Sequence, residues 1–238
     1  MTKPHCHYNS DGIIVAIDGP AGAGKSTIAK GLALVLNYLY VDSGAMYRAV
    51  ALYFLDNNID IENNAEVRLA LKNISISFHD DQNNRIVFLN GVDVTELIRK
   101  PRIYTILSKI SALKEVRDSL VVLQRGFSKN FSLVMEGRDI GTIVFPEANY
   151  KFFLIADPSV RARRRYLELK HNGEMNIDEA KILEEIKMRD QKDSTREIAP
   201  LKKAIDAIEI DSSKINAEDV MKKMLTHLNP EKQFQGQP

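Results

Sequence analysis

Short apolar runs alternate with longer amphipathic stretches along most of this chain. Five runs have the length and the branched side chains of buried strands: residues 13–18, 38–42, 133–135, 150–155 and 207–210. Stretches of helical character lie between and after them: residues 25–37, 44–57, 158–171 and 216–228. Strands that alternate with helices predict an α/β fold, with a parallel sheet that carries helices on both faces.

The middle of the chain follows a different pattern. Residues 74–78 and 85–89 alternate apolar and polar positions, and a polar cluster separates the two runs. This alternation predicts an antiparallel β-hairpin, which two helices near 101–112 and 114–128 should follow. We therefore expect a core domain formed by residues 12–59 and 113–228, with an inserted subdomain at 60–112.

Three polar segments complete this organisation. Residues 172–200 are rich in charge and predict a mobile lid. Residues 1–11 predict a flexible tail, and residues 229–238 a second polar tail. His5, Cys6 and His7 could ligate a metal, but a loose terminus is the preferred interpretation of this segment.

The composition narrows the functional classes. The 238 residues carry 33 Lys and Arg against 32 Asp and Glu, a net charge of +1. This balance argues against a strongly basic nucleic-acid-binding protein and against an acidic tail. One cysteine excludes an internal disulfide framework and a multi-cysteine zinc site. No apolar run reaches the roughly 18 residues of a membrane helix, so we expect a soluble cytoplasmic protein that does not contact membranes.

A glycine-rich segment between the first predicted strand and helix matches the pattern G-x-x-x-x-G-K-[ST] of the phosphate-binding P-loop. It consists of Gly19, Pro20, Ala21, Gly22, Ala23, Gly24, Lys25, Ser26 and Thr27. The glycines let backbone N–H groups approach phosphate oxygens, and the helix N-terminus adds partial positive charge. Lys25 would reach the β- and γ-phosphates of a nucleotide, and Ser26 would bind Mg²⁺.

A phosphate-binding loop does not by itself select a reaction. A GTPase should show Asn-Lys-x-Asp, and the chain has no such motif. A motor ATPase usually shows an apolar strand that ends in two acidic residues. The nearest stretch is Val134-Met135-Glu136, which Gly and Arg follow. Residues outside the phosphate loop must therefore indicate which reaction the protein catalyses.

The second predicted strand and helix meet at Asp42-Ser43-Gly44, with Tyr47 and Arg48 one turn further on. Because the carboxyl ends of parallel strands share one edge of a sheet, this turn should lie beside the phosphate loop. Arg48 could hold a monophosphate through two hydrogen bonds. The alternative is an ordinary capped helix in which Arg48 is solvated.

The segment Gly137-Arg138-Asp139-Ile140-Gly141-Thr142 ends another predicted strand and should face the same edge. Arg138 is a candidate phosphate ligand, and Asp139 could accept hydrogen bonds from an exocyclic amine. A local salt bridge within a turn is the alternative interpretation.

Arginines crowd the helix before the lid. Arg161, Arg164 and Arg165 have the spacing of one helix face, and Glu168 could pair with Arg164 or Arg165. Arg189, Asp190, Asp193 and Arg196 show similar spacing within the lid. Both groups could either stabilise helices or meet a ligand. Together with a P-loop and a second basic pocket, they favour phosphoryl transfer between two nucleotides beneath a lid that excludes water.

These motifs resemble those of the bacterial cytidylate kinases, a family of nucleoside monophosphate kinases, from about Ile13 to Leu228. The resemblance rests on the following segments: Gly19–Thr27, Leu39–Arg48, Val116-Arg117, Gln124-Arg125, Gly137–Pro146, Arg189-Asp190 and Ala199–Ala207. It implies a P-loop NTPase-type sheet, a monophosphate-binding insertion, and phosphoryl transfer from ATP to CMP or dCMP with Mg²⁺. One departure is Glu136, which stands where the family often has Asp.

The resemblance also implies roles for individual residues. Ser43, Tyr47, Arg48 and Arg138 would contact the phosphate side of CMP, and Ser108, Arg117 and Asp139 would recognise cytosine. Arg189, Asp193 and Arg196 would reach the ribose or phosphate from the lid. Arg161, Arg164 and Arg165 would serve ATP and the transition state, with Lys25, Arg138, Arg164, Arg165 and Arg196 as the catalytic set.

Three alternatives stay open: a kinase for another monophosphate such as UMP, a non-catalytic nucleotide-binding module, and a nucleic-acid-binding protein. The preferred prediction is a monomer whose partners are ATP and CMP or dCMP, without nucleic acid.

Overall fold

The computed structural model describes residues 12–81, 84–171 and 173–228. The tails predicted at 1–11 and 229–238, with His5, Cys6 and His7, lie outside these residues. The described chain forms two compact units, one from Val41–Phe127 and the other from the residues before and after it. The unit formed by the flanking residues contains all of the five-stranded sheet except Val41 and Asp42. The Val41–Phe127 unit extends beyond the predicted 60–112 insertion at both ends.

A five-stranded sheet confirms the predicted α/β fold. Its strand order is β2-β6-β1-β7-β8, and β1 pairs in parallel with both β6 and β7, as β7 does with β8. The strands are β1 (Ile14–Asp18), β2 (Leu39–Asp42), β6 (Leu133–Gly137), β7 (Tyr150–Ile155) and β8 (Ile208–Asp211). Four of the five residues of β1, and all of β6, are buried, as expected for strands covered on both faces.

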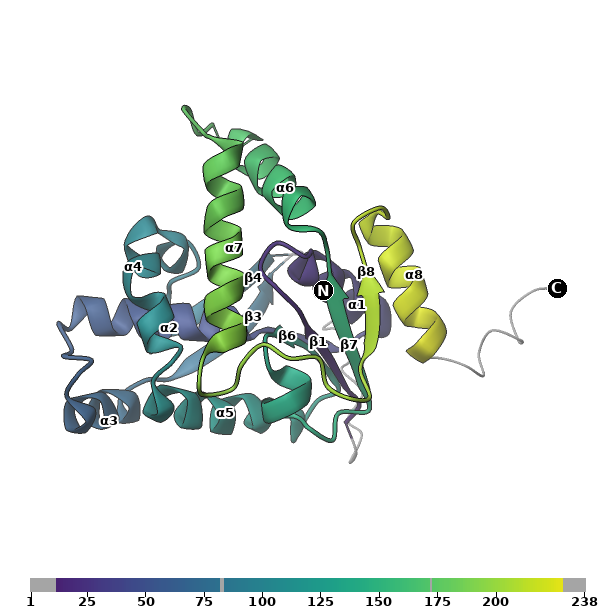
Figure 1. Ribbon diagram of the computed structural model, residues 1–238. Coiled ribbons are helices and arrows are strands. Elements are labelled where there is room, and N and C mark those ends of the chain that lie inside the picture. The colour runs from purple at the N-terminus through teal and green to yellow at the C-terminus, as the bar shows by residue number, and fades with distance from the viewer. Residues whose placement is uncertain (1–11, 82–83, 172, 229–238) are drawn as a thin grey trace. The chain divides into compact units, whose positions relative to one another are not determined.

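Helices α1 (Lys25–Leu36) and α8 (Ala217–Leu228) pack together beside this sheet (Figure 1). Their apolar residues form a core with Val15, Ile17 and Phe152 of the strands. The two helices approach closely at Gly31, where a Cβ atom would lie 2.4 Å from the sulfur of Met221. Helix α1 is capped by Asn37, whose left-handed φ of 56° directs its N–H to the carbonyl oxygens of Ala33 and Leu34.

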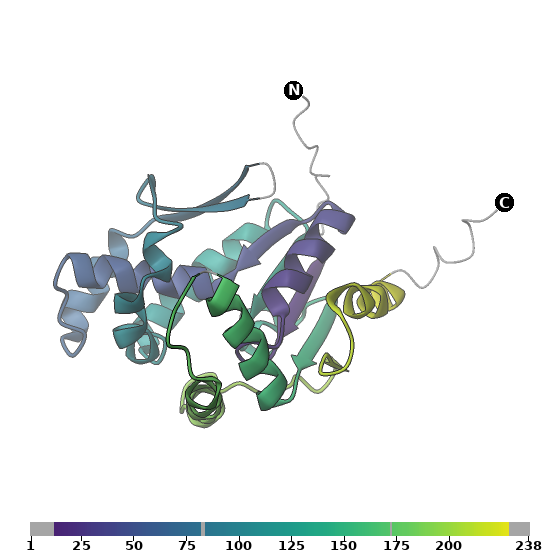
Figure 2. The same ribbon diagram turned by 90° about the horizontal axis from the view of Figure 1, so that it is seen from above.

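Helices α6 (Pro158–His171) and α7 (Glu179–Thr195) form an antiparallel pair that begins just after β7 (Figures 1 and 2). They share a small apolar core centred on Ala162, Ile182 and Ile186. From the sequence, a helix was an open possibility only for 189–196 of the predicted lid. In the structure, Asp178 caps a helix that continues from Glu179 to Thr195.

The Val41–Phe127 unit contains a helical cluster and the predicted hairpin. Its helices are α2 (Ser43–Asp56), α3 (Asn64–Lys72), the short 3₁₀ turn η1 (Leu97–Arg99), α4 (Pro101–Ile110) and α5, which runs from Lys114 to Ser128. Strands β3 (Ile76–Asp81) and β4 (Asn84–Leu89) pair antiparallel, and the two-residue strand β5 (Val92–Asp93) joins β4. Helix α3 is not among the elements expected from the sequence; the Asn63 side chain caps it by accepting hydrogen bonds from the N–H groups of Ala65 and Glu66.

Candidate active site

The glycine-rich loop is shaped by backbone conformations that side chains resist. Gly19, Gly22 and Gly24 have φ angles of 149°, 76° and 92°. A Cβ atom at Gly19 would lie 2.0 Å from the carbonyl oxygen of Leu154, so only glycine fits there. Gly24 stands at the N-cap of α1 and has no side chain to bond the first N–H groups of the helix. These groups are therefore suited to an anion.

Lys25 is buried in this loop, with 5% of its surface exposed. Its ammonium donates to the carbonyl oxygen of Pro20 at 2.7 Å. Burial, followed by the positive charge of Arg138, lowers the pKa of Lys25 to about 7, against the opposing effects of Glu136 and Asp18. A buried cation with this depressed pKa gains from a polyanionic ligand, because phosphate oxygens replace the lost hydration.

The register of the sheet brings a second segment to the phosphate loop. Asp18 is paired with Gly137 across β1 and β6, so Gly19 and Arg138 leave neighbouring strands at one edge. This placement agrees with the expectation that 137–142 faces the same edge. Beside it, the buried carboxylate of Glu136 accepts a hydrogen bond from the Tyr40 hydroxyl at 2.7 Å.

Asp18 itself holds the segment after Arg138. Its two carboxylate oxygens accept hydrogen bonds from the backbone N–H groups of Ile140 and Gly141, at 2.8 and 2.7 Å. Burial raises the pKa of Asp18 to about 6, although the two backbone hydrogen bonds act in the opposite direction.

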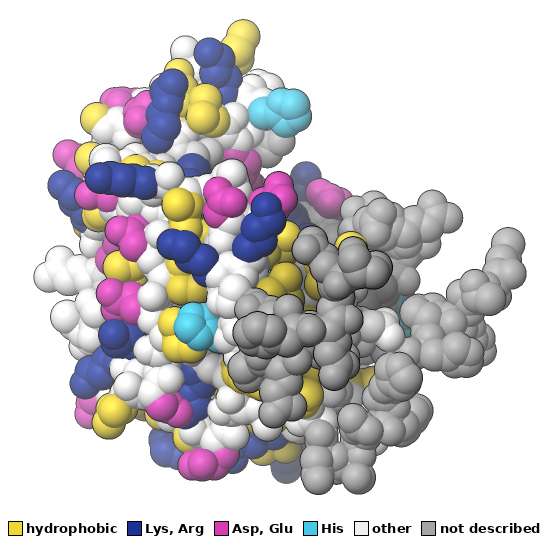
Figure 3. Space-filling view, turned by 90° about the vertical axis from the view of Figure 1, so that its right-hand side faces the viewer, with side chains coloured by type: hydrophobic (Ala, Val, Ile, Leu, Met, Phe, Trp, Pro, Cys, Tyr) yellow, Lys and Arg dark blue, Asp and Glu magenta, His cyan; other side chains and the backbone are white. Residues whose placement is uncertain are grey.

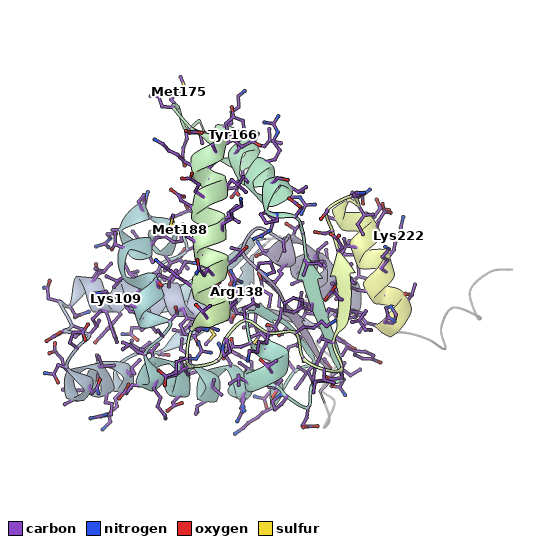
Figure 4. All side chains as sticks on the ribbon, in the orientation of Figure 1. Lys109, Arg138, Tyr166, Met175, Met188 and Lys222 are labelled. Carbon is purple, nitrogen blue, oxygen red and sulfur yellow. The ribbon has the colours of Figure 1, made fainter. Side chains whose placement is uncertain are left out.

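Carboxylates of α7 and of the loop pair with the arginines of this site. The Nε of Arg138 donates to Asp193 at 2.8 Å (Figure 4 labels Arg138 beside α7). A guanidinium nitrogen of Arg196 lies 3.8 Å from Asp139, and both side chains are nearly buried. The structure therefore brings together four of the predicted residues, Arg138, Asp139, Asp193 and Arg196.

Arg161 is buried and ties three parts of the sheet-bearing unit together. It donates to the carbonyl oxygens of Ala156 and Ala21, and it makes two further hydrogen bonds to Asp190 at 3.0 and 2.6 Å. Arg161 thus links the phosphate loop to both α6 and α7. Its guanidinium is bonded to protein acceptors on each side.

Arg164 reaches the phosphate loop indirectly, and Arg165 lies apart. Arg164 donates to the hydroxyl and the carbonyl oxygen of Ser212, and the Ser212 hydroxyl donates to the carbonyl oxygen of Ala23. Arg165 is half exposed and pairs with Glu168 at 2.9 Å. The structure therefore does not bring Arg165 together with the other arginines. Arg189, the last of the predicted lid residues, carries a positive charge that helps to lower the pKa of Lys25.

The Val41–Phe127 unit holds a second group of predicted residues. Asp42 caps α2 through the N–H of Ala45 and forms an ion pair with Arg48 at 2.9 Å. The guanidinium of Arg117 lies over the Tyr47 ring, 5.6 Å from its centroid, and is buried. The capped-helix interpretation of Asp42 is correct, but Arg48 is ion-paired and largely shielded.

Ser43 and Ser108 differ in exposure. Ser43 is buried in the first turn of α2. Ser108 is exposed on α4, and its carbonyl oxygen accepts a hydrogen bond from Ser111. Arg117 donates to the carbonyl oxygen of Ser111, which lies between Ser108 and Arg117 in the chain.

The cytidylate kinase family model matches residues 15–230, which include every residue of both groups. The chain belongs to the cytidylate kinase family. It is 50% identical over 212 residues to the cytidylate kinase of Fusobacterium nucleatum, covering 89% of this chain and 94% of the relative. It is 48% identical to the enzyme of Caldicellulosiruptor bescii over 90% of this chain and 94% of the relative, and 44% identical to that of Bacillus cereus, over 90% and 95%.

The donor groups of this family member fit a divalent cation held mainly by a nucleotide. Ser26 presents an exposed hydroxyl at the first turn of α1, and Glu136 places a carboxylate within the field of Lys25. Among the described residues, no cluster of three or more His, Cys, Asp or Glu side chains could hold a metal alone. Mg²⁺ usually binds through few protein ligands, several waters and substrate phosphates, which this donor set permits.

Several contacts of the candidate site were not predicted. No local spacing predicts these contacts, because they join residues far apart in the chain. They are the hydrogen bonds of Asp18, the Tyr40–Glu136 hydrogen bond and the bridge through Ser212. One signal was available: Asp18 is a charged residue at the end of an otherwise apolar run. A buried carboxylate at that position needs donors from elsewhere in the fold.

Proposed function

We propose that this member of the family transfers the γ-phosphoryl group of ATP to CMP or dCMP, giving ADP and CDP or dCDP. The observation that carries the proposal is the register that sets Arg138 and Asp139 beside a phosphate loop with a buried lysine. This edge offers a polyanion site and, next to it, a cation and a carboxylate for a second nucleotide.

The donor half of the proposed site is the loop from Gly19 to Thr27. Its N–H groups would hold the triphosphate of ATP, and Lys25 would bind the β- and γ-phosphates. Ser26 would bind Mg²⁺, which when present neutralises charge on the phosphates. Arg161 and Arg164, already bonded to Ala21 and Ser212, would stabilise this loop and the charge near it.

The acceptor half would recognise a cytidine monophosphate. Arg138 and Arg48 would bind its phosphate, as would Ser43 and Tyr47, while Arg117 and Ser108 would contact the base. Asp139 would accept a hydrogen bond from the exocyclic amine of cytosine. Uracil has a carbonyl at that position, which a carboxylate repels, so the same group would select against UMP.

The chemical step needs no side-chain base. An oxygen of the CMP phosphate attacks the γ-phosphorus, a new P–O bond forms, and the bond to the β,γ-bridging oxygen breaks, so that ADP leaves with the electron pair. Charge spreads over the transferred group in this step. Lys25, Arg138 and Arg196 would stabilise it in a site from which water is excluded.

The α6–α7 pair supplies the groups expected of a lid. Asp190 and Asp193 pair with Arg161 and Arg138, so each arginine is held in place before a phosphate arrives. We propose that the substrate phosphate displaces Asp193 from Arg138, and that Asp193, Arg189 and Arg196 then contact the ribose or phosphate. Closure over the nucleotides would prevent transfer of the phosphoryl group to water.

The wider setting is part of the same proposal. Among the described residues, no helix is both long and apolar enough to cross a membrane. Positive and negative side chains are mixed on the face shown in Figure 3, and the net charge is +1. We propose a cytoplasmic monomer that acts on small nucleotides with Mg²⁺ and does not bind nucleic acid.

The test is a panel of initial rates with CMP, dCMP, UMP and AMP, each with ATP and with GTP as donor. CMP and dCMP should give the highest kcat/KM by a clear margin. A clear preference for UMP would contradict the cytosine assignment, and a flat response to every monophosphate would favour a non-catalytic nucleotide-binding module.

A further inference from the structure

The segment after Arg138 is an unusual turn that needs an outside partner. Residues Ile140–Val144 form a single π-helical turn, in which the N–H groups of Val144 and Phe145 bond to the carbonyl oxygens of Asp139 and Ile140. The first N–H groups of any helical turn have no acceptor within it. In this turn those groups belong to Ile140 and Gly141, and they are buried.

The residue at the N-cap position does not supply the acceptor. Asp139 is of a type that often caps helices, yet its side chain makes no capping hydrogen bond. Its carboxylate instead lies 3.8 Å from Arg196. Asp18 accepts from both N–H groups, one on each oxygen, from a position 122 residues earlier in the chain.

The surroundings leave little room for another arrangement. Asp18 is 4% exposed. A Cβ atom at Gly141 would lie 3.4 Å from the Asp18 carboxylate and 3.2 Å from the Lys151 side chain. The ammonium group of Lys151 in turn binds the carbonyl oxygen of Pro146 and both carboxylate oxygens of Asp206. The turn is thus fixed at its first residues by Asp18 and at its end by Lys151.

We infer that Asp18 is a positioning residue that caps the turn Ile140–Val144 in place of Asp139 and so keeps the Asp139 carboxylate directed toward Arg196 and the substrate. A carboxylate can accept two N–H groups at once, whereas an amide offers one oxygen and opposes the other N–H with a donor. Without the cap from Asp18, the neighbouring Asp139 is the nearest carboxylate able to take over, and it would be drawn away from its ligand. The catalytic part of this inference rests on the proposed function.

The test compares the wild-type protein with Asp18→Asn, and uses Asp211→Asn as a matched control. Asp211 also ends a parallel strand and accepts a backbone N–H, but its partners are the exposed atoms of Ser213. Without ligand, amide hydrogen exchange at Ile140 and Gly141 should quicken about tenfold or more in Asp18→Asn alone. The ¹³C signal of the Asp139 carboxyl should shift in the same variant.

Steady-state kinetics supply the second readout. In Asp18→Asn, kcat/KM for CMP should fall about 10²-fold, the cost of a small misplacement of a substrate-binding group. The KM for ATP should change much less than that for CMP, because the glycines and Lys25 of the phosphate loop are unaltered. Gly141→Ala, which presses a methyl group against Asp18 and Lys151, should reproduce the loss with Asp18 present.

The outcomes separate this inference from the proposed function. Unchanged exchange and an unmoved Asp139 signal in Asp18→Asn would overturn the inference, as would wild-type kinetics or an equal loss for ATP and CMP. If the wild-type protein phosphorylates no monophosphate, the proposed function fails. The exchange and carboxyl signals of the ligand-free protein then decide the inference alone.

Discussion

The Nε of Arg138 donates to the Oδ2 of Asp193 at 2.8 Å, and less than one-fifth of the surface of each side chain is exposed. This ion pair joins the end of β6 to α7. A phosphate that binds Arg138 must therefore compete with a carboxylate already in place. In the proposed reaction the pair holds the guanidinium ready, at some cost in affinity for the incoming anion.

Replacing Asp193 by Asn removes the competing charge and should strengthen the binding of inorganic phosphate. We expect a gain of about threefold to tenfold, since an ion pair that is still partly exposed contributes on the order of 1 kcal/mol. Calorimetric titration of phosphate into the ligand-free protein measures this. Glu168→Gln, which breaks the exposed Arg165 pair, should leave phosphate affinity unchanged, and weaker binding by Asp193→Asn would contradict this interpretation.

Lys25→Met should slow phosphoryl transfer strongly without unfolding the protein. The methionine keeps the apolar stem of the buried lysine and removes a charge whose pKa burial already lowers to about 7. Loss of one transition-state contact costs about 3–4 kcal/mol, or 10²–10³ in kcat. Turnover and the melting temperature measure the two effects, and wild-type turnover would rule out the assigned role of Lys25.

Asp139→Asn should reduce discrimination between CMP and UMP. The asparagine can donate to the uracil carbonyl, whereas it loses the charged acceptor for the cytosine amine. We expect kcat/KM for CMP to fall about 10- to 10²-fold, because a hydrogen bond to a charged group contributes roughly 1.5–3 kcal/mol. The KM for ATP is the internal control. A parallel loss of ATP affinity would indicate that Asp139 supports the structure of the site and does not recognise the base.

The stability of the protein should depend on pH through Asp18. Burial raises the pKa of this carboxyl from 3.8 to about 6, so the folded state holds the proton more tightly than the unfolded chain. Its contribution to stability is complete below the unfolded pKa and is lost as the pH rises through the folded one. Relative to Asp18→Asn, the wild-type protein should lose about 1–2 kcal/mol of unfolding free energy between about pH 5 and pH 7.5.

Urea unfolding of both proteins at the two pH values measures this difference. A difference that stays constant would show that the carboxyl titrates alike in the folded and unfolded states, and one of the opposite sign would show that folding lowers its pKa.

Ala199→Gly should stabilise the fold. Ala199 is nearly buried and has a φ of 49° before Pro200, a left-handed conformation that costs a residue with a Cβ atom roughly 1–2 kcal/mol. Glycine removes this strain but gains entropy in the unfolded chain, which leaves a net increase below about 1 kcal/mol. Ala180→Gly, within α7, should instead lower the melting temperature, and the same direction for both variants would contradict the strain at Ala199.

Much of the fold follows from local sequence. The apolar runs of β1 and β7, each of the two alternating runs of the hairpin, and the Gly19–Thr27 loop are shorter than about ten residues, so the sequence predicts them directly. Helix α7 was harder to predict. Only Ile182 and Ile186 are buried on it, among many charges, and their apolar partners lie on α6.

The site was predictable in its residue types more than in its contacts. Spacing placed Arg161, Arg164 and Arg165 on one side of a helix. The structure turns the first two toward Ala21 and Ser212 and pairs Arg165 with Glu168. These outcomes depend on acceptors from distant segments, as do the bonds of Asp18 to Ile140 and Gly141, and local periodicity carries no information about such partners.

The most direct test of the account is a crystal structure with a non-hydrolysable ATP analogue, CMP and Mg²⁺. We predict the triphosphate on the Gly19–Thr27 loop with its γ-phosphate at Lys25, and the cytosine amine hydrogen-bonded to Asp139. Cytidine bound away from Asp139 and Arg138, or a triphosphate away from Lys25, would contradict it.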